Sequence, residues 1–181
     1  MAWASNFSIN DRCISLTDPS YFIADIAANH DGELNRAKDL IWKAKEAGAD
    51  CAKFQHFTAN KIVSDVGFQG QYAAVSHQES WEKSVAEIYD QYHTRREWTE
   101  ELYNECRAAK IDFMSTPYDI EAIELLDKYV CAYKIGSGDI TFQKLISKIS
   151  EKGKPVILAT GASNIDDVLK AMDVIINVNR D

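Results

Sequence analysis

Lysine and glutamine side chains alternate with apolar residues in one short run of this chain, and a second lysine lies in a similar run. Lys53 and Gln55 alternate with Ala52 and Phe54, and Lys134 lies within the apolar run 131–135. Alternate residues of a strand point to opposite faces, so Lys53 and Gln55 share one face. An inward lysine needs an opposite charge, because burial disfavours its ammonium form. We predict that both lysines bind an anionic, phosphorylated substrate; the alternative is a carboxylate partner from a neighbouring strand.

Hydroxyl groups and glycines follow the same kind of run. Ser137 stands between two glycines directly after the second lysine run, and glycines let backbone amides approach an oxyanion while the serine donates to it. Thr116 and Thr160 end two further runs. We predict that all three hydroxyls contact the substrate. The alternative for the threonines is helix capping, which Asp119 or Ser163 could supply instead.

Two carboxylates accompany the lysines. Asp25 lies inside an apolar run and Asp139 lies just beyond another. Buried carboxylates are rare unless they are paired or functional, and near lysines they stay ionised. We predict that each orients a water molecule or moves a proton in catalysis. The alternative is a structural salt bridge to Lys53 or Lys134.

The histidines and cysteines show no metal-binding spacing. His30 follows the first run in a polar loop, where a hydrogen-bonding role is favoured over a metal ligand or an acid–base group. The four cysteines, at positions 13, 51, 106 and 131, stand alone and form no Cys-x-x-Cys motif. They are predicted to be buried free thiols, which indicates a reducing, cytoplasmic location.

The elements that must position these residues repeat along the chain. Five apolar runs, each followed by a helical pattern, begin near residues 22, 51, 111, 131 and 155. This rhythm predicts an α/β fold of the TIM-type (β/α) barrel class, whose functional groups lie at the carboxyl ends of the strands. We expect one domain over 1–181 with about five βα units, about three fewer than the eight of a closed barrel.

Connecting segments add three expectations. Residues 7–23 are predicted to form a hairpin that turns at Asn10-Asp11 and leads into the first barrel strand. Residues 58–80 are polar and aperiodic, which favours a lid or sugar-binding loop above the catalytic face, or equally a surface insertion. Residues 94–97 are typical of a capping box that starts a helix.

Composition excludes several classes of protein. The net charge of −8 argues against a general nucleic-acid binder, and no apolar stretch reaches the roughly 20 residues of a membrane span. The first residues show no signal peptide. Hydrophobic residues make up 46% of the chain, which suffices for a packed core. We therefore expect a cytoplasmic protein with a small-molecule substrate and neither a nucleic-acid nor a membrane partner.

The strand-end motifs resemble those of the sialic acid synthase (N-acetylneuraminate synthase) family. The order and spacing agree from about residue 7 to residue 177 in the segments 23–32, 52–55, 115–118, 133–139 and 153–161. The resemblance implies a (β/α)₈ barrel followed by an antifreeze-like domain. It also implies condensation of phosphoenolpyruvate with an N-acetylated amino sugar, usually N-acetylmannosamine, to give a sialic acid and phosphate.

The same resemblance implies a divalent metal, Mn²⁺ or Mg²⁺, and a homodimer. The family's metal-binding histidines and its antifreeze-like domain come later than these 181 residues, so we assign no metal ligand and expect the isolated chain to be inactive. Two alternatives stay open. One is a synthase for a related sugar acid, legionaminate or pseudaminate. The other is a non-catalytic half-barrel that binds anions or serves as an assembly module.

Substrate contacts follow from the resemblance residue by residue. Lys53 and Ser137 correspond to residues that hold the phosphate of phosphoenolpyruvate. Lys134 and Thr116 correspond to contacts near its carboxylate and enol end. Gln55 corresponds to a residue that positions water or substrate.

Some positions depart from the family pattern. Asp25 and Asp139 match functional carboxylates that are Glu in well-studied bacterial members, although Asp also occurs at the second position. Each shorter side chain could change the sugar that is handled. Ala159 stands where the family often has Ser, and Tyr118 stands where Phe is frequent.

Overall fold

A five-stranded parallel sheet forms the centre of the protein. The computed structural model describes residues 5–64, 66 and 83–179. The strands are adjacent in the order in which they occur in the chain, which is the arrangement of a barrel wall. They are β3 (Ile23–Ala27), β4 (Cys51–His56), β5 (Asp112–Pro117), β6 (Tyr133–Ile135) and β7 (Val156–Leu158). The predicted fold class, a partial (β/α) barrel of α/β type, is confirmed.

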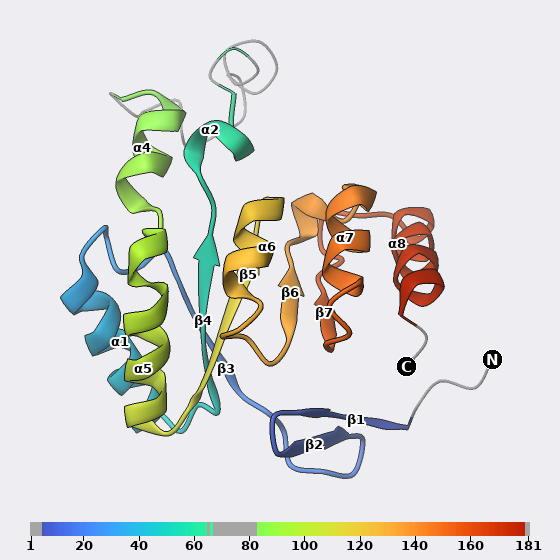
Figure 1. Cartoon of the computed structure of the whole chain (residues 1–181), viewed down its shortest axis with the longest axis horizontal. Helices are drawn as coiled ribbons and strands as arrows, with labels where there is room; N and C mark the ends of the chain where they lie inside the picture. The colour runs from blue at the N-terminus through green and yellow to red at the C-terminus, as the bar shows by residue number, and fades with distance from the viewer. Residues whose placement is uncertain (1–4, 65, 67–82, 180–181) are drawn as a thin grey trace.

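A two-stranded hairpin precedes the sheet, as predicted. Strands β1 (Asn6–Ile9) and β2 (Arg12–Ser15) pair antiparallel. Asn10 in the turn has a φ of 48°, a left-handed conformation that asparagine tolerates better than most residues. The hairpin lies at the end of the sheet opposite to the one toward which β4 points (Figure 1).

One helix follows each strand of the sheet, directly or after a longer connection. The five helices are α1 (Leu34–Glu46), α5 (Thr99–Ala109), α6 (Ile120–Leu126), α7 (Gln143–Ser150) and α8 (Ile165–Val178). Between β4 and α5 the chain forms α2 (Ala59–Ile62), α4 (Val85–Tyr92) and the 3₁₀ turn η2 (Arg96–Trp98), and η3 (Ser137–Asp139) follows β6. Helices α2 and α4 extend beyond the end toward which β4 points (Figure 1).

The two faces of the sheet carry different side chains. The outer face packs against the helices through residues such as Ala52, Phe54 and Phe113, which belong to the large core. The inner face carries Cys51 and Met114, which pack with other apolar residues and with Ile9 of the hairpin. Because strand residues alternate between faces, Lys53 and Gln55 follow Cys51 on the inner face. The hairpin thus covers the apolar part of that face and leaves the polar part toward the carboxyl ends.

Helix capping agrees with the sequence at two places and differs at one. The side chain of Asp119 accepts from the backbone N–H of Ala122 at the start of α6, as expected, and a cap also lies at the expected start of α8, although the capping residue there is Asn164 and not Ser163. The predicted capping box at 94–97 is wrong, because α5 begins at Thr99 after η2. The hydroxyl of Thr94 instead forms a hydrogen bond of 3.0 Å with His30. Most of the predicted loop 58–80 lies outside the described residues.

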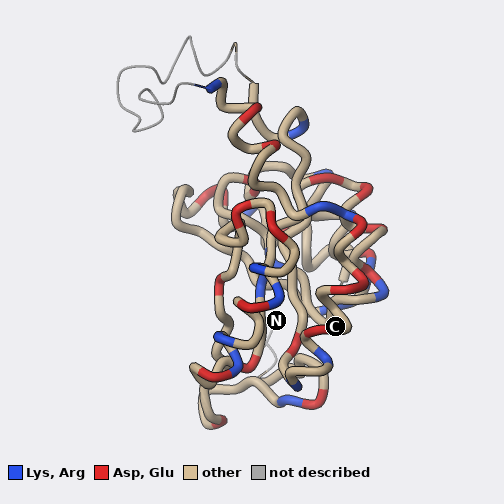
Figure 2. The backbone as a smooth tube through the Cα atoms, turned by 90° about the vertical axis from the view of Figure 1, so that its left-hand side faces the viewer, with Lys and Arg blue, Asp and Glu red and all other residues tan. Residues whose placement is uncertain are grey.

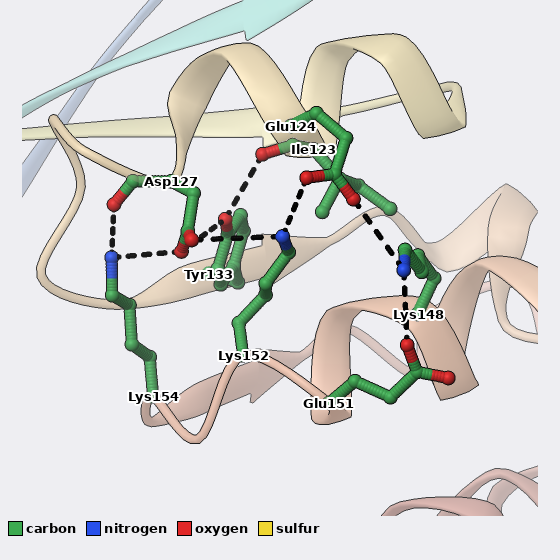
Figure 3. A network of polar contacts seen from close by, with 8 residues as sticks. All are labelled: Ile123, Glu124, Asp127, Tyr133, Lys148, Glu151, Lys152 and Lys154. Carbon is green, nitrogen blue, oxygen red and sulfur yellow. Dashed lines mark hydrogen bonds and ion pairs between the residues drawn. The ribbon is translucent and has the colours of Figure 1, made fainter.

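A polar network joins α6 to α7 and to the segment before β7 (Figure 3). Lys152 lies 2.7 Å from Glu124 and 3.6 Å from Asp127, while Lys154 lies 3.0 Å from Asp127. The hydroxyl of Tyr133 donates to this same Asp127 carboxylate at 3.2 Å. The network ties the loops at the amino ends of β6 and β7 together and therefore fixes the strand that carries Lys134.

Charges and thiols are distributed over the whole fold. Basic and acidic positions are intermixed along the backbone (Figure 2).

All four cysteines are free; Cys51 and Cys106 are buried, as predicted, and Cys131 is half-buried. The prediction is wrong for Cys13, which is exposed because it lies on the open side of the hairpin strand β2. In the described residues no helix combines the length and hydrophobicity needed to cross a bilayer.

Candidate functional site

An ion pair lies on the inner face where β3 and β4 meet. Asp25 and Lys53 are register partners in the parallel pairing, and Lys53 Nζ lies 2.6 Å from Asp25 Oδ1. Lys53 is 6% exposed as a residue, whereas the side chain of Asp25 is 61% exposed. The carboxylate partner considered in the sequence therefore exists for Lys53. The partner is open to solvent, so a substrate can also reach this pair.

Lys134 brings a second cation to the same place. It is half-buried in β6, and burial together with the positive charge of Lys53 lowers the pKa of its ammonium group. The charges of Asp25 and Asp139 oppose this shift. Lys53 and Lys134 therefore face a common region across β5, as the anion-site hypothesis requires. Within the described residues no carboxylate lies within ion-pair distance of Lys134.

Asp139 approaches the site because Gly136 leaves room for it. A Cβ atom at Gly136 would lie 2.7 Å from Asp139 Oδ2, so any other residue there would require the Asp139 carboxylate to move. The short turn η3 closes with a hydrogen bond from the Asp139 backbone N–H to the Gly136 carbonyl at 3.0 Å. Burial raises the pKa of the Asp139 carboxyl, and Lys134 opposes the rise.

Tyr118 is a site residue that the sequence reasoning did not select. The amide Nε2 of Gln55 donates to Tyr118 Oη at 3.0 Å. Burial, followed by the charges of Asp139 and Asp25, raises the pKa of Tyr118 to about 12, so the phenol keeps its proton at neutral pH. The sequence signal for Tyr118 was its position directly after the 115–117 segment. The carboxyl ends of all barrel strands lie at one rim, so a residue just after a strand lies near the site.

The three predicted hydroxyl residues lie at the same edge but differ in burial. Thr116 is 1% exposed and is the register partner of Gln55. Ser137 is half-buried in η3, and Thr160 is exposed after β7. In the part of the chain that the structure describes, no hydrogen bond joins Ser137 or Thr160 to the two lysines. The structure thus brings together Asp25, Lys53, Gln55, Lys134 and Asp139, with the hydroxyls around them.

Two buried histidines form hydrogen bonds that join the elements around the site. His30 is fully buried and contacts Thr94, in agreement with the hydrogen-bonding role favoured by the sequence. His56 lies on the outer side of β4, where its Nδ1 is 2.7 Å from Ser115 Oγ and its Nε2 is 2.9 Å from Thr99 Oγ1. Burial lowers the pKa of His56 to about 3, so the ring is neutral. His56 therefore links β4, β5 and α5 behind the site.

A metal centre is not formed by the residues that the structure describes. Among residues 5–64, 66 and 83–179, no group of three His, Cys, Asp or Glu side chains is close enough to hold a metal ion. The described side chains can bind an anion between two ammonium groups and can accept or donate protons through two carboxylates.

Known proteins resemble this chain in sequence and in fold. It is 33% identical to the N,N'-diacetyllegionaminic acid synthase of Campylobacter jejuni, covering 84% of this chain and 46% of that protein. It is 30% identical to the human N-acetylneuraminate-9-phosphate synthase, covering 93% and 46%. The chain spans about half the length of the curated relatives it matches. The crystal structure of the N-acetylneuraminic acid synthetase of Leptospira borgpetersenii superposes with a TM-score of 0.80 at 22% identity, covering 95% of this chain and 55% of that chain.

The family model gives the same assignment over most of the sequence. The model of the NeuB family matches residues 40–181, which include β4 to α8 and all predicted site residues except Asp25. The resemblance to sialic acid synthases drawn from the strand-end motifs is confirmed by these matches. On this evidence the chain belongs to the NeuB family.

Proposed function

We propose that this protein condenses phosphoenolpyruvate with an N-acetylated amino sugar such as N-acetylmannosamine, forming a nonulosonic (sialic) acid and phosphate. Membership of the NeuB family supports the reaction class. The observation that carries the proposal is the pair of ammonium groups on one face: Lys53 is buried beside Asp25, and Lys134 interacts electrostatically with both. The positive charge of Lys53 contributes to the lowered pKa of Lys134, and a ligand with two negative groups would offset this repulsion.

Each side chain has a proposed role in holding the substrates. Lys53 and Ser137 bind the phosphate, and Lys134 and Thr116 bind the carboxylate and enol end of phosphoenolpyruvate. Gln55 positions water or substrate. Thr160, which is exposed at the end of β7, supplies a further hydroxyl contact at the rim.

The two carboxylates act on protons in the proposed reaction. C3 of the enol phosphate forms the new bond to the aldehyde carbon of the open-chain sugar, and the aldehyde oxygen takes a proton. Water then adds at C2, loses a proton, and phosphate leaves as its C–O bond breaks. Asp25 is open to the substrate, and Asp139 has a raised pKa. These observations support the proposed role of both carboxylates, which is to orient the water and accept its proton.

Further parts of the proposal concern the whole protein. We propose that residues 1–181 form one partial barrel domain of a cytoplasmic homodimer. A divalent ion, Mn²⁺ or Mg²⁺, takes part in the proposed reaction, and we assign none of the described residues to hold it. The isolated chain is expected to release no phosphate from phosphoenolpyruvate and N-acetylmannosamine in the presence of Mn²⁺, and steady release would contradict this expectation.

Calorimetric titration of the 181-residue chain with phosphoenolpyruvate tests the central claim. The wild-type chain should bind it, and Lys134→Met should weaken binding at least about tenfold, because hydrogen bonds to charged groups contribute about 1.5–3 kcal/mol. Lys38→Met is the matched control, since Lys38 pairs with Glu101 on the outer helices. Absence of binding by the wild-type chain refutes the proposal.

Two alternatives to this function stay open: a different amino-sugar substrate, and a non-catalytic module that assembles with a second copy. One relative of this chain is named an N,N'-diacetyllegionaminic acid synthase. Precursors of legionaminate or pseudaminate are therefore competing substrates to include in the assays. Two observations bear on a non-catalytic half-barrel: Ile165 and Leu169 of α8 are 69% and 55% exposed, and β7 is an edge strand of the described sheet. Such edges favour pairing with a second copy. Light scattering that shows a stable monomer would exclude that dimeric module.

A further inference from the structure

Among the described residues the hydroxyl of Tyr118 accepts one hydrogen bond, from Gln55, and has no acceptor for its own proton. Gln55 Nε2 donates to Tyr118 Oη at 3.0 Å, so this amide occupies one lone pair of the phenol oxygen. A phenol can accept and donate at once, and its own proton must therefore point away from Gln55. Among the described residues no acceptor for that proton lies within hydrogen-bond distance. Within the described residues the hydroxyl therefore has a donor but no acceptor.

The surroundings hold this hydroxyl in place at the rim. The ring of Tyr118 packs edge-to-face on Phe57, with centroids 5.9 Å apart, and its backbone N–H donates to the His56 carbonyl at 3.1 Å. The position where a Cβ of Gly136 would stand is 3.7 Å from Tyr118 Oη and 2.7 Å from Asp139 Oδ2. The phenol therefore lies beside the group of charged residues that the site contains.

We propose that Tyr118 is a further ligand-binding residue, whose hydroxyl donates to an oxygen of the enol phosphate bound between Lys53 and Lys134. This inference rests on the proposed function. The amide that donates to the phenol oxygen polarises its O–H bond and makes it a better donor. A bound oxyanion is a stronger acceptor than water, so this hydrogen bond forms chiefly with the ligand.

Titration of Tyr118→Phe with phosphoenolpyruvate at neutral pH tests the inference. The substitution keeps the ring on Phe57 and removes only the hydroxyl, and the dissociation constant should rise about tenfold. Tyr103→Phe is the matched control. Its ring packs edge-to-face on Phe113 near the start of β5, at the opposite end of the strand from Tyr118. This control should bind like the wild-type chain.

The outcomes separate this inference from the proposed function. Binding by the wild-type chain and equal binding by Tyr118→Phe would overturn the inference and leave the proposed function standing. No binding by the wild-type chain would overturn both. If Tyr118→Phe does not fold, a tyrosine labelled with ¹³C at Cζ, introduced at position 118 alone, replaces it. Its resonance should move when phosphoenolpyruvate saturates the chain, and an unchanged resonance overturns the inference.

Discussion

Removing the carboxylate of Asp25 would leave the ammonium group of Lys53 buried without its partner. Lys53 is 6% exposed and lies 2.6 Å from Asp25, whose side chain is 61% exposed. Breaking a fully buried ion pair costs about 3–5 kcal/mol, and an exposed pair contributes about 0–1 kcal/mol. Because water reaches one side of this pair, we expect Asp25→Ala to lower the free energy of unfolding by about 2 kcal/mol.

The opposite substitution should cost much less. Lys53→Met keeps the apolar stem in its buried place and removes the charge that also repels Lys134. Asp25 is then left mostly in water, where a lone carboxylate is well solvated. We expect Lys53→Met to change the free energy of unfolding by less than about 0.5 kcal/mol. The asymmetry between the two single substitutions, rather than either value, is the signature of this geometry.

Urea unfolding at pH 7, followed by circular dichroism, measures these changes. Asp31→Ala is the matched control, because Asp31 pairs with Arg36 at 3.1 Å and both side chains are about half exposed. That surface pair should contribute no more than about 1 kcal/mol. A loss for Lys53→Met equal to or larger than that for Asp25→Ala would refute the reasoning, since it would mean that the buried lysine does not depend on Asp25.

Three further predictions concern the framework. Burial holds the pKa of His56 near 3, against an ordinary value of 6.5, so the unfolded chain binds the extra proton between these values. The free energy of unfolding should therefore fall as pH is lowered from 6.5, and His56→Gln should flatten this fall in urea titrations. Gly32→Ala should lower the melting temperature, since φ is +76° and the new Cβ would lie 2.5 Å from the Gln91 carbonyl oxygen; an unchanged value would contradict the backbone geometry. Asn164→Ala should cost about 1 kcal/mol in the same urea assay by removing the cap of α8, and a neutral result would argue against the capping box.

Local patterns predicted the five strands, the helices that follow them and the candidate site residues, although they placed the start of α5 too early. Alternating side chains in 51–55 placed Lys53 and Gln55 on one face, and the strand order matches the order of the apolar runs. The repeated strand–helix pattern then predicted that the carboxyl ends of the strands lie at one rim, because consecutive βα units lie side by side. These features depend on residues close in sequence, which is why the sequence alone predicts them.

Contacts between distant segments were decided only by the fold. The sequence left open whether Lys53 faced a ligand or a carboxylate, and the register of β3 against β4 supplied Asp25. The hydroxyl of Thr94 looked like a helix cap but bonds His30, which is 64 residues away.

The phenol of Tyr118 accepts a hydrogen bond from Gln55, 63 residues away, and its place at the end of the 115–117 segment indicated only the edge of the sheet and not this partner. Hydrogen bonds of this kind form only once the strands are in register, because the register sets which side chains are within reach. The sequence by itself therefore determined which face and which edge carry the chemistry, and the tertiary structure determined the partner of each group.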